Sequence, residues 1–183
     1  TPPATSASQS RGPRQLPTPS AFVIPLTGGE LIKLNCNSII WAFGIKLTFY
    51  NLCDYQTTIH SVGDTELPSK LPDGYSYVKG LKVDILTKGQ ILKELPANAG
   101  IEMDFPINNQ ARDQFAVLYW SDPDGDGKGK WIELTEQINA NQIAEHLGVT
   151  TGEELYQLIQ SFSSRFYPTL TTEKTGIFIL VKK

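Results

Sequence analysis

The chain has 183 residues, of which 40% are hydrophobic and 19% are charged, and its formal net charge is −3. This length suits one domain with a sizeable core, and no apolar run approaches the roughly 18 residues of a membrane-spanning helix. The slightly acidic balance lacks the basic surface that nucleic acid or an anionic membrane attracts, so we expect neither nucleic-acid binding nor membrane insertion.

Residues 1–20 form a segment rich in Pro, Ser and Thr that has almost no large apolar side chain. Such a segment cannot bury enough surface to offset its own ordering entropy, which predicts a linker, a glycosylated stalk or a disordered arm. No initiator Met precedes Thr1. We interpret this start as the result of removing an export signal, although a trimmed chain would look the same.

From Ala21 onward, short runs rich in β-branched and aromatic residues alternate with turn signals such as Pro72-Asp73-Gly74 and Lys88-Gly89. Residues 79–85 alternate polar and apolar side chains, as a half-buried strand does. Eight or nine such runs occur without an alternation of strands and helices. The predicted fold class is therefore mainly β, an antiparallel β-sandwich over residues 21–183 with an extended N-terminal arm.

The two cysteines, Cys36 and Cys53, each end a β-like stretch, residues 31–36 and 45–53. A short connection containing Gly44 lies between the stretches, so a hairpin would bring the two thiols together. A disulfide closing a loop of this size stabilises a fold by about 3 kcal/mol in the chain-entropy model, and it fits an oxidising compartment. The alternative is a pair of free, buried thiols.

The sharpest chemical signal is the segment SDPDGDGKGKWIEL, whose carboxylates have the spacing of a calcium loop. The residues at loop positions 1, 3, 5, 7 and 12 are Asp122, Asp124, Asp126, Lys128 and Glu133. Calcium binds hard oxygens on a loop that folds back on itself, and a glycine stands at the turn position. The flanking segments resemble strands rather than helices, and a Glu in a strand could point away from the loop. The alternative is a polar hairpin tip, because Asp-Gly is a favoured turn pair.

Residues 137–165 break the strand pattern, because their apolar side chains recur at helical spacing in two sets. This predicts a helical hairpin inserted before the last strand. Its first helix and turn resemble the DNA-binding helix-turn-helix family. The second helix offers Glu153 and Glu154 where DNA phosphates need cations, so we interpret the hairpin as packing on the sandwich.

The sequence contains no nucleophile, phosphate-binding, dinucleotide or zinc-protease motif, and we expect no enzymatic activity. The only histidines, His60 and His146, belong to no local metal or nucleophile pattern. The tryptophans leave two alternatives open, a sugar-stacking platform or core packing. We favour core packing for Trp120 and Trp131, whereas Trp41 is the best candidate for an exposed aromatic.

The segments FAVLYW, KWIEL and KTGIFILVKK are similar to the closing strands of a domain found in secreted and surface-attached bacterial proteins. IPLTGGELIKLNC, Cys53 and KELPANAGIEMDFPI extend this resemblance over most of residues 21–183. The resemblance implies a β-sandwich, export and a Cys36–Cys53 pair, and it brings no catalytic residues. The helical insertion and the acidic hairpin depart from the pattern of that family.

These observations lead to one hypothesis and one alternative for the function. The hypothesis is a structural subunit of an extracellular filament, sheath or surface layer, which assembles with copies of itself through its N-terminal arm and its sheet edges. The residues expected to make this contact are Leu16, Phe22, Val23, Ile24 and Leu26. The alternative is a monomeric cell-surface module on a Pro-rich stalk, an adhesin or a carbohydrate-binding domain with surface glycans as ligands.

Overall fold

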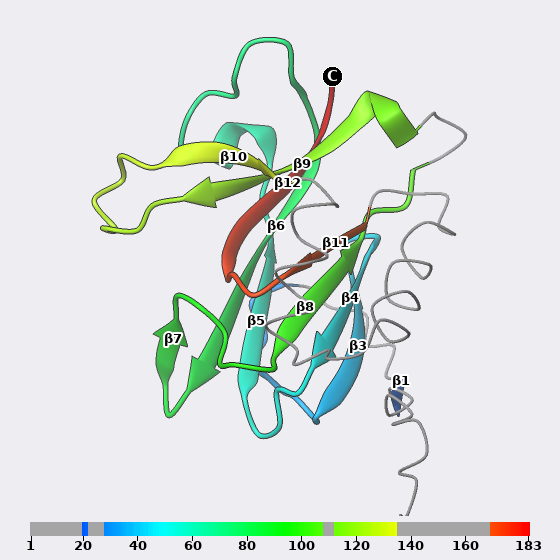
Figure 1. Cartoon of the computed structure of the whole chain (residues 1–183), viewed down its shortest axis with the longest axis vertical. Helices are drawn as coiled ribbons and strands as arrows, with labels where there is room; N and C mark the ends of the chain where they lie inside the picture. The colour runs from blue at the N-terminus through cyan, green and yellow to red at the C-terminus, as the bar shows by residue number, and fades with distance from the viewer. Residues whose placement is uncertain (1–19, 22–27, 108–111, 135–168) are drawn as a thin grey trace, which may run out of the picture.

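The computed structural model describes residues 20–21, 28–107, 112–134 and 169–183 (Figure 1). Apart from two 3-10 turns, Asp64–Glu66 and Arg112–Gln114, the regular structure of these residues consists of β-strands. The prediction of a mainly β fold is confirmed. The predicted helical hairpin at 137–165 and the arm residues 1–19 lie outside the described residues.

One sheet has five strands in the order β1-β3-β4-β8-β11. Their bounds are Ser20–Ala21 for β1, Asn37–Ala42 for β3, Ile45–Tyr50 for β4, Gly100–Asp104 for β8 and Thr169–Thr172 for β11. The pair β1–β3 is parallel and the other pairs are antiparallel. We call this sheet A.

The other sheet, sheet B, has its strands in the order β10-β9-β12-β6-β5-β2. A seventh strand, β7, also pairs with β6 but is not part of this linear order. The bounds are Ile32–Lys33 for β2, Gln56–Ser61 for β5, Ser76–Thr87 for β6, Gln90–Leu92 for β7, Phe115–Ser121 for β9, Lys130–Leu134 for β10 and Gly176–Lys182 for β12. All pairs in sheet B are antiparallel. The C-terminal strand β12 therefore lies in the interior of the sheet, between β9 and β6.

The two sheets share one hydrophobic core. Alternate side chains of each strand point into it, as the period of two in a strand requires. Its fully buried members include Leu47, Phe49, Ile101 and Met103 from sheet A and Leu81, Val83, Phe178 and Leu180 from sheet B. Burial of each such side chain stabilises the fold by about 1.5–3 kcal/mol, so this shared core accounts for the pairing of the sheets.

A second, smaller cluster covers the opposite face of sheet B. Its buried members are Ala116, Leu118, Ile179 and Val181, and side chains from the loop between β5 and β6 pack against them. Gly80 lies where β6 meets this cluster, and a Cβ at that position would come within 2.6 Å of Ile179 Cγ2. The glycine therefore allows β6 to pass beneath the cluster.

The hairpin that carries the cysteines differs from the prediction. The expected strand at 31–36 is reduced to β2, Ile32–Lys33, and the strand that pairs with β4 is β3, Asn37–Ala42. The connection is only Phe43 and Gly44, both with positive φ, 52° and 72°. A two-residue turn of this handedness matches the twist of the flanking strands, which explains why the hairpin closes there.

Candidate functional site

The disulfide predicted between Cys36 and Cys53 is present, with the two sulfur atoms 2.02 Å apart. The bridge closes the open end of the β3–β4 hairpin, next to the cross-strand pair of Asn37 and Tyr50. Both cysteines are exposed, so the alternative of two free, buried thiols is wrong. The bond ties two strands of sheet A together at the surface.

The acidic segment of the predicted calcium loop connects β9 to β10. Both oxygens of the Asp122 carboxylate accept backbone hydrogen bonds, from Gly125 N and from Gly127 N, each at 2.9 Å. Asp126 Oδ1 accepts a bond from Lys128 N at 2.9 Å, and the Lys128 ammonium lies 3.4 Å from the same carboxylate. These bonds hold the loop in a compact turn, as Asp side chains commonly do.

Glu133, at the twelfth position of that loop, is engaged elsewhere. Its carboxylate accepts hydrogen bonds from Tyr75 Oη and from Lys183 Nζ, the latter at 2.7 Å. The bond from Lys183, followed by the bond from Tyr75, lowers the pKa of Glu133. Within the described part of the chain, no group of three His, Cys, Asp or Glu side chains is placed to hold a metal ion. Calcium binding stays a prediction, and the present position of Glu133 does not contribute to it.

The tryptophans occupy two different faces of the protein. Trp120 and Trp131 form a cross-strand pair on the outer face of sheet B, with ring centroids 5.2 Å apart and an interplanar angle of 64°. Trp131 also donates its indole N–H to the Ser69 carbonyl at 3.3 Å. Trp41 lies on sheet A opposite Lys46 and is 39% exposed. The two paired rings are therefore held in place, and Trp41 is open to solvent.

A groove of ≈ 580 Å³ crosses the outer face of sheet B between β7 and the β9–β10 hairpin. Both of these elements project on the same side of the molecule (Figure 1). Apolar and aromatic lining comes from Ile91, Trp120 and Ile177, and polar lining comes from Lys82 and Asp84. The register places Ile177 of β12 opposite Lys82 of β6, and β12 also pairs with β9, which carries Trp120. With Ile91 of β7, four strands contribute to one surface.

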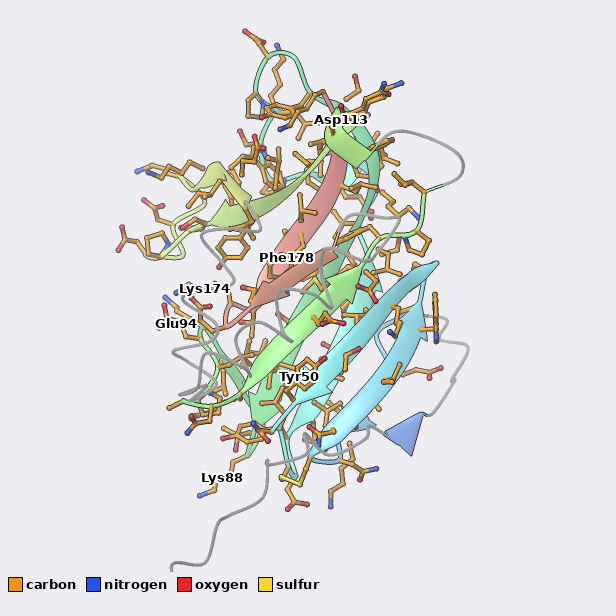
Figure 2. The ribbon with its side chains drawn as sticks, turned by 45° about the vertical axis from the view of Figure 1, so that its right-hand side comes forward. Tyr50, Lys88, Glu94, Asp113, Lys174 and Phe178 are labelled. Atoms are coloured by element: carbon orange, nitrogen blue, oxygen red, sulfur yellow. A yellow bond between two sulfur atoms is a disulfide. The ribbon has the colours of Figure 1, made fainter. Side chains whose placement is uncertain are left out.

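The charged groups of this groove are paired with opposite charges or with backbone hydrogen-bonding groups. Lys82 Nζ lies 2.8 Å from the Asp84 carboxylate. Lys174 forms an ion pair with Glu94 where β7 and β12 approach each other (Figure 2). At the rim, Lys93 Nζ donates to the Pro123 carbonyl at 2.7 Å and so links β7 to the acidic loop. The lining thus carries donors and acceptors without an excess of either charge.

The outward face of sheet A carries two buried carboxylates, Glu102 and Asp104, which are only 3% and 1% exposed. Tyr50, labelled in Figure 2, donates a hydrogen bond from Oη to Glu102 at 3.3 Å. Lys46 Nζ lies 3.3 Å from Asp104. A buried carboxylate needs such partners because its desolvation is costly. The alternation of β8 indicates that the two acids share one face, but nothing in the sequence indicates that this face is buried.

Comparisons with protein-family models and with curated proteins find no match for this chain. The resemblance to a domain of secreted bacterial proteins therefore stays a prediction. Across the described residues, no helix is both long and apolar enough to cross a membrane.

The sequence-based prediction brought together only part of the candidate site. Asp122, Asp124, Asp126 and Lys128 do share one loop, whereas Glu133 points to other partners. The assembly residues Leu16, Phe22, Val23, Ile24 and Leu26 lie outside the described residues, as does His146. The groove was missed because its residues come from separate strands, and the one available signal was the Trp pair flanking the acidic turn.

Proposed function

We propose that the chain is a secreted β-sandwich domain that serves as a structural subunit of an extracellular filament, sheath or surface layer. The observation that carries this proposal is the pairing of β1 with β3, in which Ser20 lies opposite Ser38 and Ala21 opposite Ile39. Within one chain, the end of the N-terminal segment is thus added as a parallel strand to the edge of its own sheet A. In the proposed polymer, the same edge receives the segment of a neighbouring copy instead.

Strand addition of this kind suits a polymer for two reasons. An edge strand presents main-chain donors and acceptors that a further strand satisfies, which gives affinity without demanding a special side-chain pocket. A head-to-tail contact between an arm and a distant edge forms an open polymer when its rotation does not close. In the proposed polymer, the arm and β1 leave their own domain together and pair with the edge of a neighbouring copy. The exposed disulfide fits the oxidising space outside a cell.

A pair of truncations tests the proposal. Removal of residues 1–27 deletes β1 and the whole arm, and we expect a folded protein that stays monomeric in light scattering and forms no particles in electron microscopy. Removal of residues 1–10 retains Leu16 to Leu26 and should leave assembly intact. Normal polymerisation of the longer truncation would contradict the proposal, as would a full-length chain that remains monomeric at high concentration.

The second candidate function is the monomeric binding module on a Pro-rich stalk. The observation that favours it is the groove on sheet B, whose volume falls within the range of about 300–1,000 Å³ typical of small-ligand sites. A monomeric full-length chain that binds a ligand would favour this function over the structural one.

A further inference from the structure

We propose that the groove between β7 and the β9–β10 hairpin is a binding site for a neutral oligosaccharide. The inference deepens the second candidate function, because it names the ligand class of the same groove on sheet B, and it does not depend on whether the chain polymerises. Three properties of the groove lead to it: a fixed aromatic ring, an exposed apolar side chain and a balanced set of charges.

The aromatic ring is Trp120, which is fixed by its surroundings. Trp131 packs edge-on against it and is itself held by the hydrogen bond to the Ser69 carbonyl. Gly129 lies against the same ring, because a Cβ there would come within 2.7 Å of Trp120 Cε2. A ring held in this way loses little conformational freedom when a ligand stacks on it.

One apolar side chain of the groove, Ile91, is open to solvent, and Ile177 is partly buried against the second hydrophobic cluster. Ile91 is 57% exposed, the highest value among the large hydrophobic side chains described. Ile91 lies on β7, across the groove from Trp120 on β9. The partly buried Ile177 lies on β12, the strand next to β9. A sugar ring has an apolar C–H face, and such faces pack against indole and aliphatic side chains while their hydroxyl edges remain free.

The polar groups suit those hydroxyl edges. A hydroxyl both donates and accepts, and the adjacent Lys82 ammonium and Asp84 carboxylate offer one partner of each kind. The groove is lined by three cations, Lys82, Lys93 and Lys174, and by three anions, Asp84, Glu94 and Asp122. A polyanion such as nucleic acid would meet as much repulsion as attraction there, whereas a neutral chain of sugars requires no net charge.

The test uses the full-length chain and four neutral probes: cellohexaose, hexa-N-acetylchitohexaose, mannohexaose and maltohexaose. Isothermal titration and quenching of tryptophan fluorescence should detect binding of at least one probe, with Kd below about 1 mM. Trp120→Ala should weaken that binding at least about tenfold, the usual loss when an aromatic anchor is truncated. The matched control, Trp41→Ala, removes an exposed tryptophan on sheet A and should leave Kd unchanged.

A second variant keeps the proposal falsifiable if Trp120→Ala fails to fold. Ile91→Glu changes an exposed position, so it should keep the melting midpoint and still weaken binding about tenfold. The proposal is overturned if none of the four probes binds at about 5 mM. It is equally overturned if Ile91→Glu and Trp120→Ala both bind as the unmodified chain does, or if Trp41→Ala abolishes binding.

Discussion

Glu133 shows at the scale of a single residue how the C-terminus is held to the sheet. Its carboxylate accepts bonds from Tyr75, in the loop before β6, and from Lys183, the last residue of the chain. The hydrogen bond between Lys183 and Glu133 raises the pKa of Lys183, and the hydrogen bond between Tyr75 and Glu133 raises the pKa of Tyr75. Three segments distant in sequence therefore meet at one carboxylate.

The sign of the pH dependence follows from the lowered pKa of Glu133. A carboxylate whose pKa is lower in the folded state than in the unfolded state stabilises the fold above its unfolded pKa and loses this effect as the pH falls through the folded pKa. Glu133→Gln should therefore lower the free energy of unfolding by about 1 kcal/mol at neutral pH, because the side chain is partly exposed. Well below the carboxylate pKa the variant and the unmodified chain should agree.

Urea denaturation at a pH of about 7 and of about 3 measures this difference. Asp73→Asn is the control, because Asp73 is an exposed acid in the loop before Tyr75. This variant should leave the free energy of unfolding unchanged at both pH values. An effect of Glu133→Gln that persists unchanged in acid would show that charge plays no part in it.

The β3–β4 hairpin is the element that depends most on a covalent bond. Its turn places Phe43 at positive φ, a conformation that costs free energy for an aromatic residue, and its open end is closed by Cys36 and Cys53. We expect the double variant Cys36→Ser/Cys53→Ser to be less stable by about 3 kcal/mol in chemical denaturation.

Reduction of the unmodified protein provides the matched control for this prediction. Both cysteines are exposed, so a reductant reaches them in the folded state and should lower stability to the level of the double variant. The double variant itself should be insensitive to reductant. If the oxidised protein, the reduced protein and the double variant were equally stable, the disulfide would not contribute to the stability of sheet A.

The β9–β10 turn is the element on which the calcium prediction depends. Calcium that binds the folded state preferentially stabilises it by about 2.7 kcal/mol at a hundredfold excess over Kd, which should raise the melting midpoint by roughly 5–10 °C. Asp124→Asn should abolish this shift and leave in place the hydrogen bonds that Asp122 accepts from Gly125 N and Gly127 N. Glu133→Gln should retain the shift, since its carboxylate is held by Tyr75 and Lys183. Identical midpoints with millimolar calcium and with chelator would define the loop as a polar turn only.

At the scale of the whole molecule, the shared core separates two surfaces with different properties. The edge at β3 belongs to sheet A, where main-chain groups accept an added strand. The groove belongs to the outer face of sheet B, where side chains from β6, β7, β9 and β12 meet. The proposed assembly through the arm and the proposed binding in the groove therefore concern different parts of the protein, and substitutions can test them separately.

Much of the fold follows from local features of the sequence. The alternation in residues 79–85 and the β-branched residues of GIFILVKK determine strands because a half-buried strand needs one apolar face. The cysteine pair was predictable, since the two residues flank a single short hairpin. The strand β3 was missed because the connection was expected to be longer, and only its pairing with β4 shows that residues 37–42 are extended.

Only the tertiary structure decided which side chains meet. Periodicity determines the face on which a residue lies, but it contains no information on the order of strands in a sheet. The approach of Trp120, Lys82 and Ile91 follows from β12 lying between β9 and β6, and from β7 folding back on β6. For the same reason Glu133 pairs with Lys183, 50 positions away, rather than with the aspartates of its own loop.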